Sequence, residues 1–202
     1  DKNGLPGVAY FDGWDGDLKF ARFNSTHWNI EKIDSTGSVG LYPSLAFSRG
    51  NGPVITYYNR TKGDLRMAQT ATGGWNIATL DSANDVGRFS SLMLDPNRPD
   101  STKWAVAYED TTNGAAKFLI QGNIGPGAKA NGYTYYTMDD VGIFGGYISL
   151  AFFDTKSADP ARKYMPAVSF YNATNQSMKL AWASDPNFGM TTATIATNNH
   201  KN

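Results

Sequence analysis

The sequence predicts an all-β protein, a β-propeller built from about four tandem four-stranded blades. Residues 43–82 contain four strand-sized apolar runs separated by turn-forming clusters, and similar segments recur with a period in the upper forties. One four-stranded sheet cannot bury both of its faces alone, so such units must pack on one another. A period of this length without helical patterning favours propeller blades over a helical solenoid.

The strands expected in this segment are rich in Val, Ile, Tyr and Trp, as strands usually are. They are Ser44–Phe47, Pro53–Tyr58, Leu65–Gln69 and Trp75–Leu80. Between them lie clusters of Gly, Asn, Asp and Thr, residues that tolerate positive φ or hydrogen-bond to their own backbone. This order predicts an antiparallel meander.

Self-comparison of the chain shows how the unit recurs. Tyr10–Ala21 aligns with Tyr57–Ala68, and Trp28–Asp34 aligns with Trp75–Asp81, both with an offset of 47 residues. Weaker copies begin at Tyr108 and Phe170. The expected organisation is a single propeller domain, residues 1–202, with blade copies at approximately 1–43, 44–90, 91–148 and 149–202.

The joints between copies repeat as well. Each contains a Gly followed two residues later by an aromatic residue: Gly40 and Tyr42, Gly87 and Phe89, Gly142 and Phe144. This spacing predicts a backbone bend that places a ring between adjacent sheets.

The repeat resembles a family of bacterial secreted and cell-surface propeller repeats. The resemblance rests on Ser44–Phe47, Gly52–Asn59, Gly63–Ala68, Gly73–Asp81 and Asp85–Gly87. Blade layout is also similar, more loosely, to sialidase-type and tachylectin-type propellers. The resemblance implies a secreted or cell-surface protein, which agrees with a composition rich in Gly, Asn, Thr, Ser and Tyr.

The third and fourth copies depart from the pattern. They carry insertions at Asp95–Lys103, Gln121–Gly132, Asp154–Lys163 and Asp185–Gly189. Such loops are where binding usually resides on a rigid scaffold, and also where sequence drift is tolerated.

The first copy lacks its opening strand, since Leu5–Phe11 already matches the second strand of the unit. Two arrangements fit this observation. The chain is a fragment of a larger propeller, or has its missing strands supplied by another chain. Alternatively, it is a closed four-bladed ring with one three-stranded blade.

Charge and hydropathy exclude several classes of partner. The chain has 18 basic and 18 acidic side chains, a formal net charge of zero and no charged block. This argues against a nucleic-acid partner. No segment is apolar enough for membrane insertion. Cysteine is absent, so disulfides and thiolate metal sites are excluded, and we expect no cofactor and no metal.

Candidate binding residues are those expected at one mouth of the propeller, where the turns after each second strand meet the joints between blades. They are Trp14, Asp17, Tyr42, Tyr58, Arg60, Asp64, Arg88, Phe89 and Phe144. If the source were eukaryotic, Asn24, Asn59 and Asn172 would be candidates for N-glycosylation.

The sequence offers few residues from which a catalytic site could be assembled. Glutamate occurs only at Glu31 and Glu109, and the two histidines, His27 and His200, fall in a turn and a tail. The acidic run Asp12–Asp17 matches a hairpin turn better than a calcium loop.

These features favour a non-catalytic extracellular binding or adhesion module that recognises carbohydrate or a cell-surface protein. One alternative is a structural subunit that assembles by edge-strand pairing, as a homo-oligomer or with missing blades of the same parent chain. Another is part of a sialidase-like glycan hydrolase.

Overall fold

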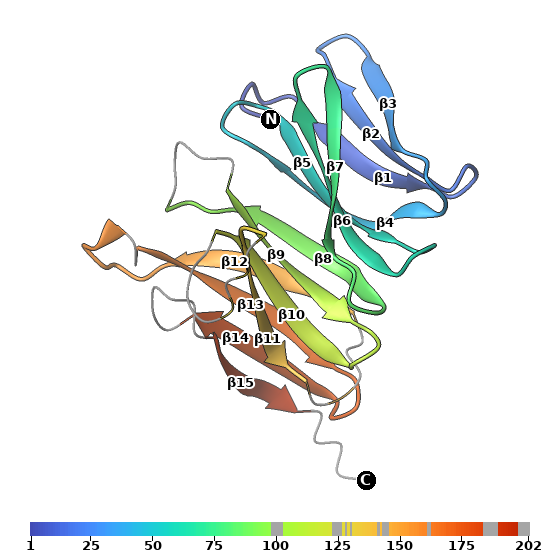
Figure 1. Ribbon diagram of the computed structural model, residues 1–202. Coiled ribbons are helices and arrows are strands. Elements are labelled where there is room, and N and C mark those ends of the chain that lie inside the picture. Colours follow the sequence, from blue (N-terminus) through green and yellow to red (C-terminus); the bar gives the residue numbers. More distant parts are fainter. Residues whose placement is uncertain are drawn as a thin grey trace.

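Fifteen β-strands, and no α-helix, make up the described part of the chain in the computed structural model. The structure describes residues 1–97, 103–122, 127, 129, 131–140, 142, 146–160, 163–183 and 190–197. The strands form four separate antiparallel sheets, one with three strands and three with four. We call these sheets blades 1 to 4 in chain order (Figure 1).

Blades 1 and 2 contain the first seven strands. Blade 1 consists of β1 (Gly7–Asp12), β2 (Asp17–Phe23) and β3 (Trp28–Asp34). Blade 2 consists of β4 (Val39–Phe47), β5 (Pro53–Asn59), β6 (Asp64–Ala71) and β7 (Gly74–Asp81). In both blades, consecutive strands are hydrogen-bonded neighbours, as the meander prediction requires.

Blades 3 and 4 repeat the same order. Blade 3 consists of β8 (Val86–Leu94), β9 (Trp104–Asp110), β10 (Ala115–Gln121) and β11 (Tyr133–Asp139). Blade 4 consists of β12 (Ser149–Asp154), β13 (Tyr164–Asn172), β14 (Ser177–Ala183) and β15 (Met190–Thr197). The all-β prediction, with a first blade that lacks its opening strand, is confirmed.

Backbone register follows the offset found in the sequence. Tyr10 pairs with Lys19 in blade 1, and Tyr57 pairs with Arg66 in blade 2. The same pairing joins Tyr108 to Lys117 in blade 3 and Phe170 to Lys179 in blade 4. Residues at these equivalent positions therefore occupy equivalent places in the four sheets.

The opening strands of blades 2 and 3 are longer than the sequence predicted. β4 begins at Val39 rather than Ser44, because Val39 and Leu41 already pair with Asn59 and Tyr58, with one register shift before Leu41 and another after it. The first shift spans Gly40, which has a φ of 99° and lies against the backbone of Leu18, where a Cβ would approach to 2.7 Å. The backbone bend expected at the glycine is thus a bulge within a longer strand.

The hydrophobic core lies between blades rather than within them. One cluster, including Phe20 and Tyr57, joins blades 1 and 2, and a second, including Leu65 and Trp104, joins blades 2 and 3. A third cluster, centred on Phe118 and Phe170, joins blades 3 and 4. Each sheet therefore needs its neighbour to be covered.

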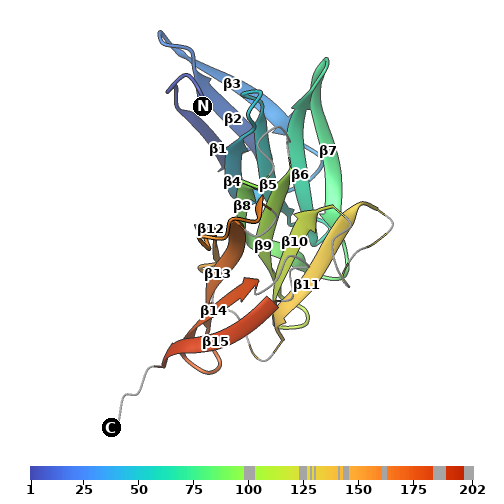
Figure 2. The same ribbon diagram turned by 90° about the vertical axis from the view of Figure 1, so that its left-hand side faces the viewer.

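The blades follow one another along an open arc and do not close into a ring in the described part of the chain (Figures 1 and 2). Neighbouring opening strands contact each other, β4 against β8 and β8 against β12. We call these three the inner strands. Among the described residues, no helix has the length and apolar character needed to span a membrane.

Candidate functional site

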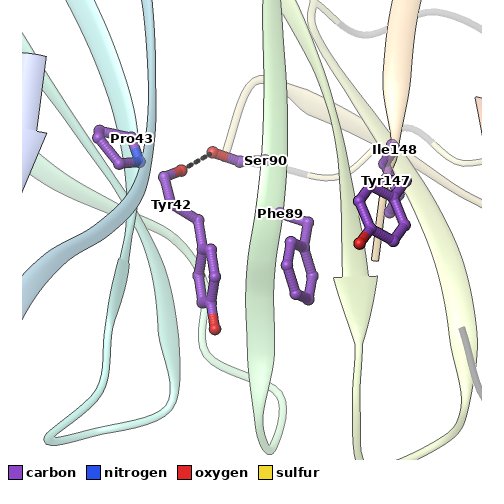
Figure 3. A pocket seen from close by; sticks show the side chains of 6 residues that line it. All are labelled: Tyr42, Pro43, Phe89, Ser90, Tyr147 and Ile148. Carbon is purple, nitrogen blue, oxygen red and sulfur yellow. Dashed lines mark hydrogen bonds between the residues drawn. The ribbon is translucent and has the colours of Figure 1, made fainter. Parts of the chain in front are cut away.

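A hollow of about 370 Å³ lies between the inner strands of blades 2, 3 and 4. We call it the inner-strand pocket, and Figure 3 shows its lining. Each blade contributes two consecutive residues: Tyr42 and Pro43, Phe89 and Ser90, Tyr147 and Ile148. It is therefore made by three successive blades and exists only when they are assembled.

An unusual backbone conformation positions the three rings. Tyr42, Phe89 and Tyr147 have positive φ angles of 50°, 52° and 59°. Residues other than glycine rarely adopt this conformation, which costs about 1–3 kcal/mol and is found disproportionately at binding and switch regions. The rings of Tyr42 and Phe89 lie side by side, with centroids 4.3 Å apart (Figure 3).

A polar cluster adjoins this pocket. The Tyr58 hydroxyl donates to Asp85 Oδ1 at 2.6 Å, and Arg88 donates to Asp85 Oδ2 at 2.8 Å. The Arg88 guanidinium also lies over the Tyr58 ring, 5.2 Å from its centroid, and that ring is 6.3 Å from the ring of Tyr42. The cluster thus holds Arg88 close to the aromatic lining, with its charge neutralised by Asp85.

Glu109 is a buried acid next to this cluster. It faces Arg88 across the β8–β9 pair and is 5% exposed. Burial raises its pKa to about 7; Arg88 partly offsets this effect, and Asp85 and Asp110 add to it. In blade 2 the equivalent pair is Leu41 and Tyr58, neither of which is charged. Blade 3 therefore has a pair of charged residues where blade 2 has none.

A recurrent ion pair locks each blade to the next. Asp34 at the end of β3 accepts hydrogen bonds from Tyr57 and Arg66 of blade 2, both at 2.7 Å. Burial works to raise the pKa of Asp34, but the hydrogen bonds from Thr36 and Tyr57 and the charge of Arg66 outweigh it, and the pKa lies below its ordinary value.

The same arrangement joins the later blades. Asp81 of blade 2 accepts from Tyr108 at 2.7 Å and from Lys117 at 2.6 Å. Between blades 3 and 4, Asp139 pairs with Lys179, and Phe170 stands where the other blades have a tyrosine. An acid at the end of one blade and a cation in the next therefore connect the blades at all three junctions.

One of these blade junctions also forms a hollow, of about 320 Å³, which we call the gap pocket. It lies between the end of β7 and strands β10 and β11. Asp81, Lys117, Lys129 and Tyr135 line it, with Ala83, Gly127, Tyr136 and Thr137. The Lys129 ammonium lies 4.5 Å from the centroid of the Tyr135 ring.

The insertion at Gln121–Gly132 makes the gap pocket different from the junction of blades 1 and 2. Within its described residues, it folds back on β11 through bonds from Tyr135 N to Gly127 O at 3.0 Å and from Lys129 N to Tyr133 O at 2.9 Å. The register places Ile77 in blade 2 where blade 3 has Tyr135. Blade 3 therefore has both a loop and an aromatic lining residue that blade 2 lacks at the equivalent place.

No protein-family profile and no curated protein sequence matches the chain. Solved structures do. AofleA from Arthrobotrys oligospora superposes with a TM-score of 0.60 at 17% identity, over 94% of this chain and 56% of its own. A mutant of AofleA with three arginines replaced by alanine gives a TM-score of 0.60 at 16% identity, over 96% of this chain and 57% of its own.

The SapL1 lectin, solved in complex with alpha methyl fucoside, gives a TM-score of 0.59 at 17% identity, over 95% of this chain and 59% of its own. The chain thus spans less than three-fifths of the length of each of these proteins. At such identities the likeness is one of fold. The chain is a β-propeller.

The propeller brings together four of the residues that sequence reasoning selected: Tyr42, Tyr58, Arg88 and Phe89. Phe144 lies outside the described residues. Tyr147, two residues before the Ser-Leu of β12, has the positive φ and the place in the pocket that Tyr42 and Phe89 have in their blades.

The other selected residues lie away from both pockets. Trp14 is 96% exposed in the β1–β2 turn, and Arg60 is exposed in the β5–β6 turn. Asp17 is buried and pairs with Lys32 at 2.7 Å, and Asp64 is buried at the start of β6. These two acids belong to the sheet rather than to a binding surface.

The three glycosylation candidates differ in burial. Asn24 is exposed, whereas Asn59 and Asn172 are fully buried. The side-chain oxygen of Asn59 accepts from the backbone of Thr61, and that of Asn172 from Asn175, so both amides hold turns. Among the described residues, no group of three or more His, Cys, Asp or Glu side chains could hold a metal ion.

Sequence reasoning did not select Glu109 or the gap-pocket residues as binding candidates. Both could have been noticed as departures from the repeat, since Glu109 and Tyr135 replace Tyr58 and Ile77 of the preceding copy. The partners of these residues could not be read from the sequence, because a bulge and an insertion set the local register.

Proposed function

We propose that this propeller is a lectin-like carbohydrate-binding module and that the gap pocket holds the sugar. The observation that carries the proposal is the composition of that pocket, in which a tyrosine ring, two lysines and a carboxylate meet in about 320 Å³. A volume of this size is at the lower end of the range for small-molecule sites.

The pocket offers the two kinds of contact that a pyranose needs. The Tyr135 ring supplies a flat apolar surface for the C–H face of a sugar, and its hydroxyl is already fixed by donation to Leu80 O at 2.7 Å. Lys129 and Lys117 are donors for sugar hydroxyls, and Asp81 is an acceptor.

Fixed geometry is a further advantage of this site. Lys117 is held by Asp81 at 2.6 Å, and the hydrogen bond from Lys117, with that from Tyr108, keeps the pKa of Asp81 below its ordinary value despite burial, which tends to raise it. Asp81 is therefore ionised, and both side chains are in place before a ligand arrives, which reduces the ordering cost of binding.

The fold supports the carbohydrate class, because SapL1 is a lectin solved with alpha methyl fucoside. The module works by binding without catalysis, at the cell surface or after secretion, with a glycan as its partner. These placements follow from the composition and from the resemblance to secreted propeller repeats.

The test is a glycan-array screen followed by calorimetric titration of α-methyl fucoside and the best array ligand. Lys117→Met removes a pocket donor together with an inter-blade ion pair, and Arg66→Met removes the equivalent ion pair between blades 1 and 2. We expect Lys117→Met to weaken binding at least tenfold and Arg66→Met to leave it within twofold. Lys129→Ala, in an exposed position, should weaken binding about threefold to tenfold.

If Lys117→Met and Arg66→Met reduced glycan affinity equally, the loss would come from weaker packing between blades and not from a change in the gap pocket. An array without saturable binding to any glycan would overturn the proposal.

A further inference from the structure

The inner-strand pocket differs chemically from the gap pocket, since none of its six lining residues is charged. Its lining consists of three aromatic residues, a proline, an isoleucine and a serine. We propose that it is a second ligand site of the propeller and that it takes a neutral aromatic ring. This inference stands independently of carbohydrate binding in the gap pocket.

Accessible ring surface is the first observation in favour of a ligand. Tyr147 is 83% exposed and Tyr42 is 36% exposed. Tyr42 lies in the inner strand β4, and Tyr147 lies two residues before the inner strand β12. Exposed aromatic rings that converge on a concave surface usually mark a binding site. Their positive φ angles show that the backbone holds them there at a conformational cost.

The wall of the pocket is the second observation. Gly146, with a φ of 78°, packs so closely on Phe89 that an added Cβ would lie 2.9 Å from its ring. The glycine leaves room for the Phe89 ring, and the next residue, Tyr147, lines the same pocket (Figure 3). A side chain at position 146 would displace the Phe89 ring and change the pocket.

The charges around the pocket argue against a cationic ligand. Arg88 directly precedes Phe89, but its guanidinium is paired with Asp85 at 2.8 Å. Among the described residues no carboxylate lines the pocket, so the charge of a quaternary ammonium group would have no counter-ion there. A neutral ligand needs none.

The polar atoms argue against a sugar in this pocket. Ser90 Oγ is already bonded to Tyr42 O and to Thr56 Oγ1, each at 3.1 Å. Apart from the hydroxyls of Tyr42 and Tyr147, the described lining side chains offer no further hydrogen-bonding group. These two are too few to replace the hydrogen bonds to water that the several hydroxyl groups of a sugar ring would lose. An aromatic ring needs few such partners and gains from stacking on Phe89 or Tyr147.

The experiment titrates the whole chain with phenol and follows its amide and aromatic NMR signals. Cyclohexanol is the non-aromatic ring of matched size, choline the cation and α-methyl fucoside the sugar. Tyr147→Ala removes an exposed ring and should not unfold the chain, and Trp14→Ala removes an even more exposed ring elsewhere as a control. Gly146→Ala displaces the wall at Phe89.

We expect phenol to shift signals of Tyr42, Phe89 and Tyr147 saturably, and cyclohexanol to bind at least threefold more weakly. Tyr147→Ala should weaken phenol binding about threefold to tenfold, the range expected for the loss of one ring contact. Gly146→Ala should weaken it too, and Trp14→Ala should leave it unchanged.

Three results would each overturn the inference: equal binding of cyclohexanol and phenol, tighter Tyr147-dependent binding of choline or α-methyl fucoside, or phenol binding unaffected by Tyr147→Ala and Gly146→Ala. Loss of glycan binding in the gap pocket would leave this result untouched, so the two proposals fail separately.

Discussion

Burial of Glu109 should make the stability of the propeller depend on pH in a direction opposite to that of its inter-blade acids. The pKa of Glu109 is about 7 in the folded chain, against an ordinary value of 4.5. Between these pH values the folded state keeps a proton that the unfolded state has released. The free energy of unfolding therefore falls as pH rises through this window.

The size of the effect follows from the shift in pKa. One pKa unit corresponds to about 1.4 kcal/mol, so a shift from 4.5 to about 7 lowers the free energy of unfolding by about 3 kcal/mol between pH 4.5 and pH 7.5. The inter-blade acids Asp34 and Asp81 have lowered pKa values, so their contributions are lost only at more acidic pH. Above pH 4.5 the contributions of Asp34 and Asp81 are therefore nearly constant, and comparison with a variant at position 109 gives the contribution of Glu109.

The assay is urea unfolding followed by tryptophan fluorescence at pH 4.5, 5.5, 6.5 and 7.5, for the native chain and Glu109→Gln. Glutamine matches the neutral form of the side chain and does not titrate. The difference in stability between the two proteins should therefore change by about 3 kcal/mol across the series, with the variant favoured at high pH. A difference that does not change with pH would refute the reasoning.

Two further substitutions, with a third as a control, test the packing of one blade on the next. Tyr108→Phe removes the buried hydroxyl that donates to Asp81 and should lower the free energy of unfolding by about 2 kcal/mol in urea titrations; an unchanged midpoint would contradict this account of the inter-blade contact. Gly87→Ala places a Cβ 2.6 Å from the Leu65 Cα at a φ of 107°, and should cost about 3 kcal/mol or more. Gly73→Ala, also at positive φ but with open space around it, should cost only about 1 kcal/mol, and equal costs for the two glycines would count against the close approach.

The sequence was sufficient for the fold because side-chain pattern and turn chemistry agree along the chain. Tyr10 and Tyr57, which the self-comparison aligns, pair with Lys19 and Arg66, which it aligns as well. The glycine and aromatic residue of each joint also predicted a bend that positions a ring, and Tyr42 and Phe89 behave in this way.

The binding surfaces were harder to predict because they arise where the pattern is interrupted. Arg88 faces Glu109 only because the register shifts on both sides of Arg88, and no spacing rule anticipates such a shift. Lys129 comes over the Tyr135 ring because an insertion folds back on its own strand. Asp17 and Asp64 resembled surface residues in the sequence, but the start of a strand buries both.

Carbohydrate binding in the gap pocket is tested most directly by locating a bound glycan. An NMR titration with α-methyl fucoside, and with the strongest ligand from the glycan array, would report which residues the sugar contacts. The account predicts saturable shifts of the Tyr135 ring and of the Lys129 and Thr137 amides, with those of Trp14 unmoved. Saturable shifts confined to another surface, or none with any glycan, would contradict it.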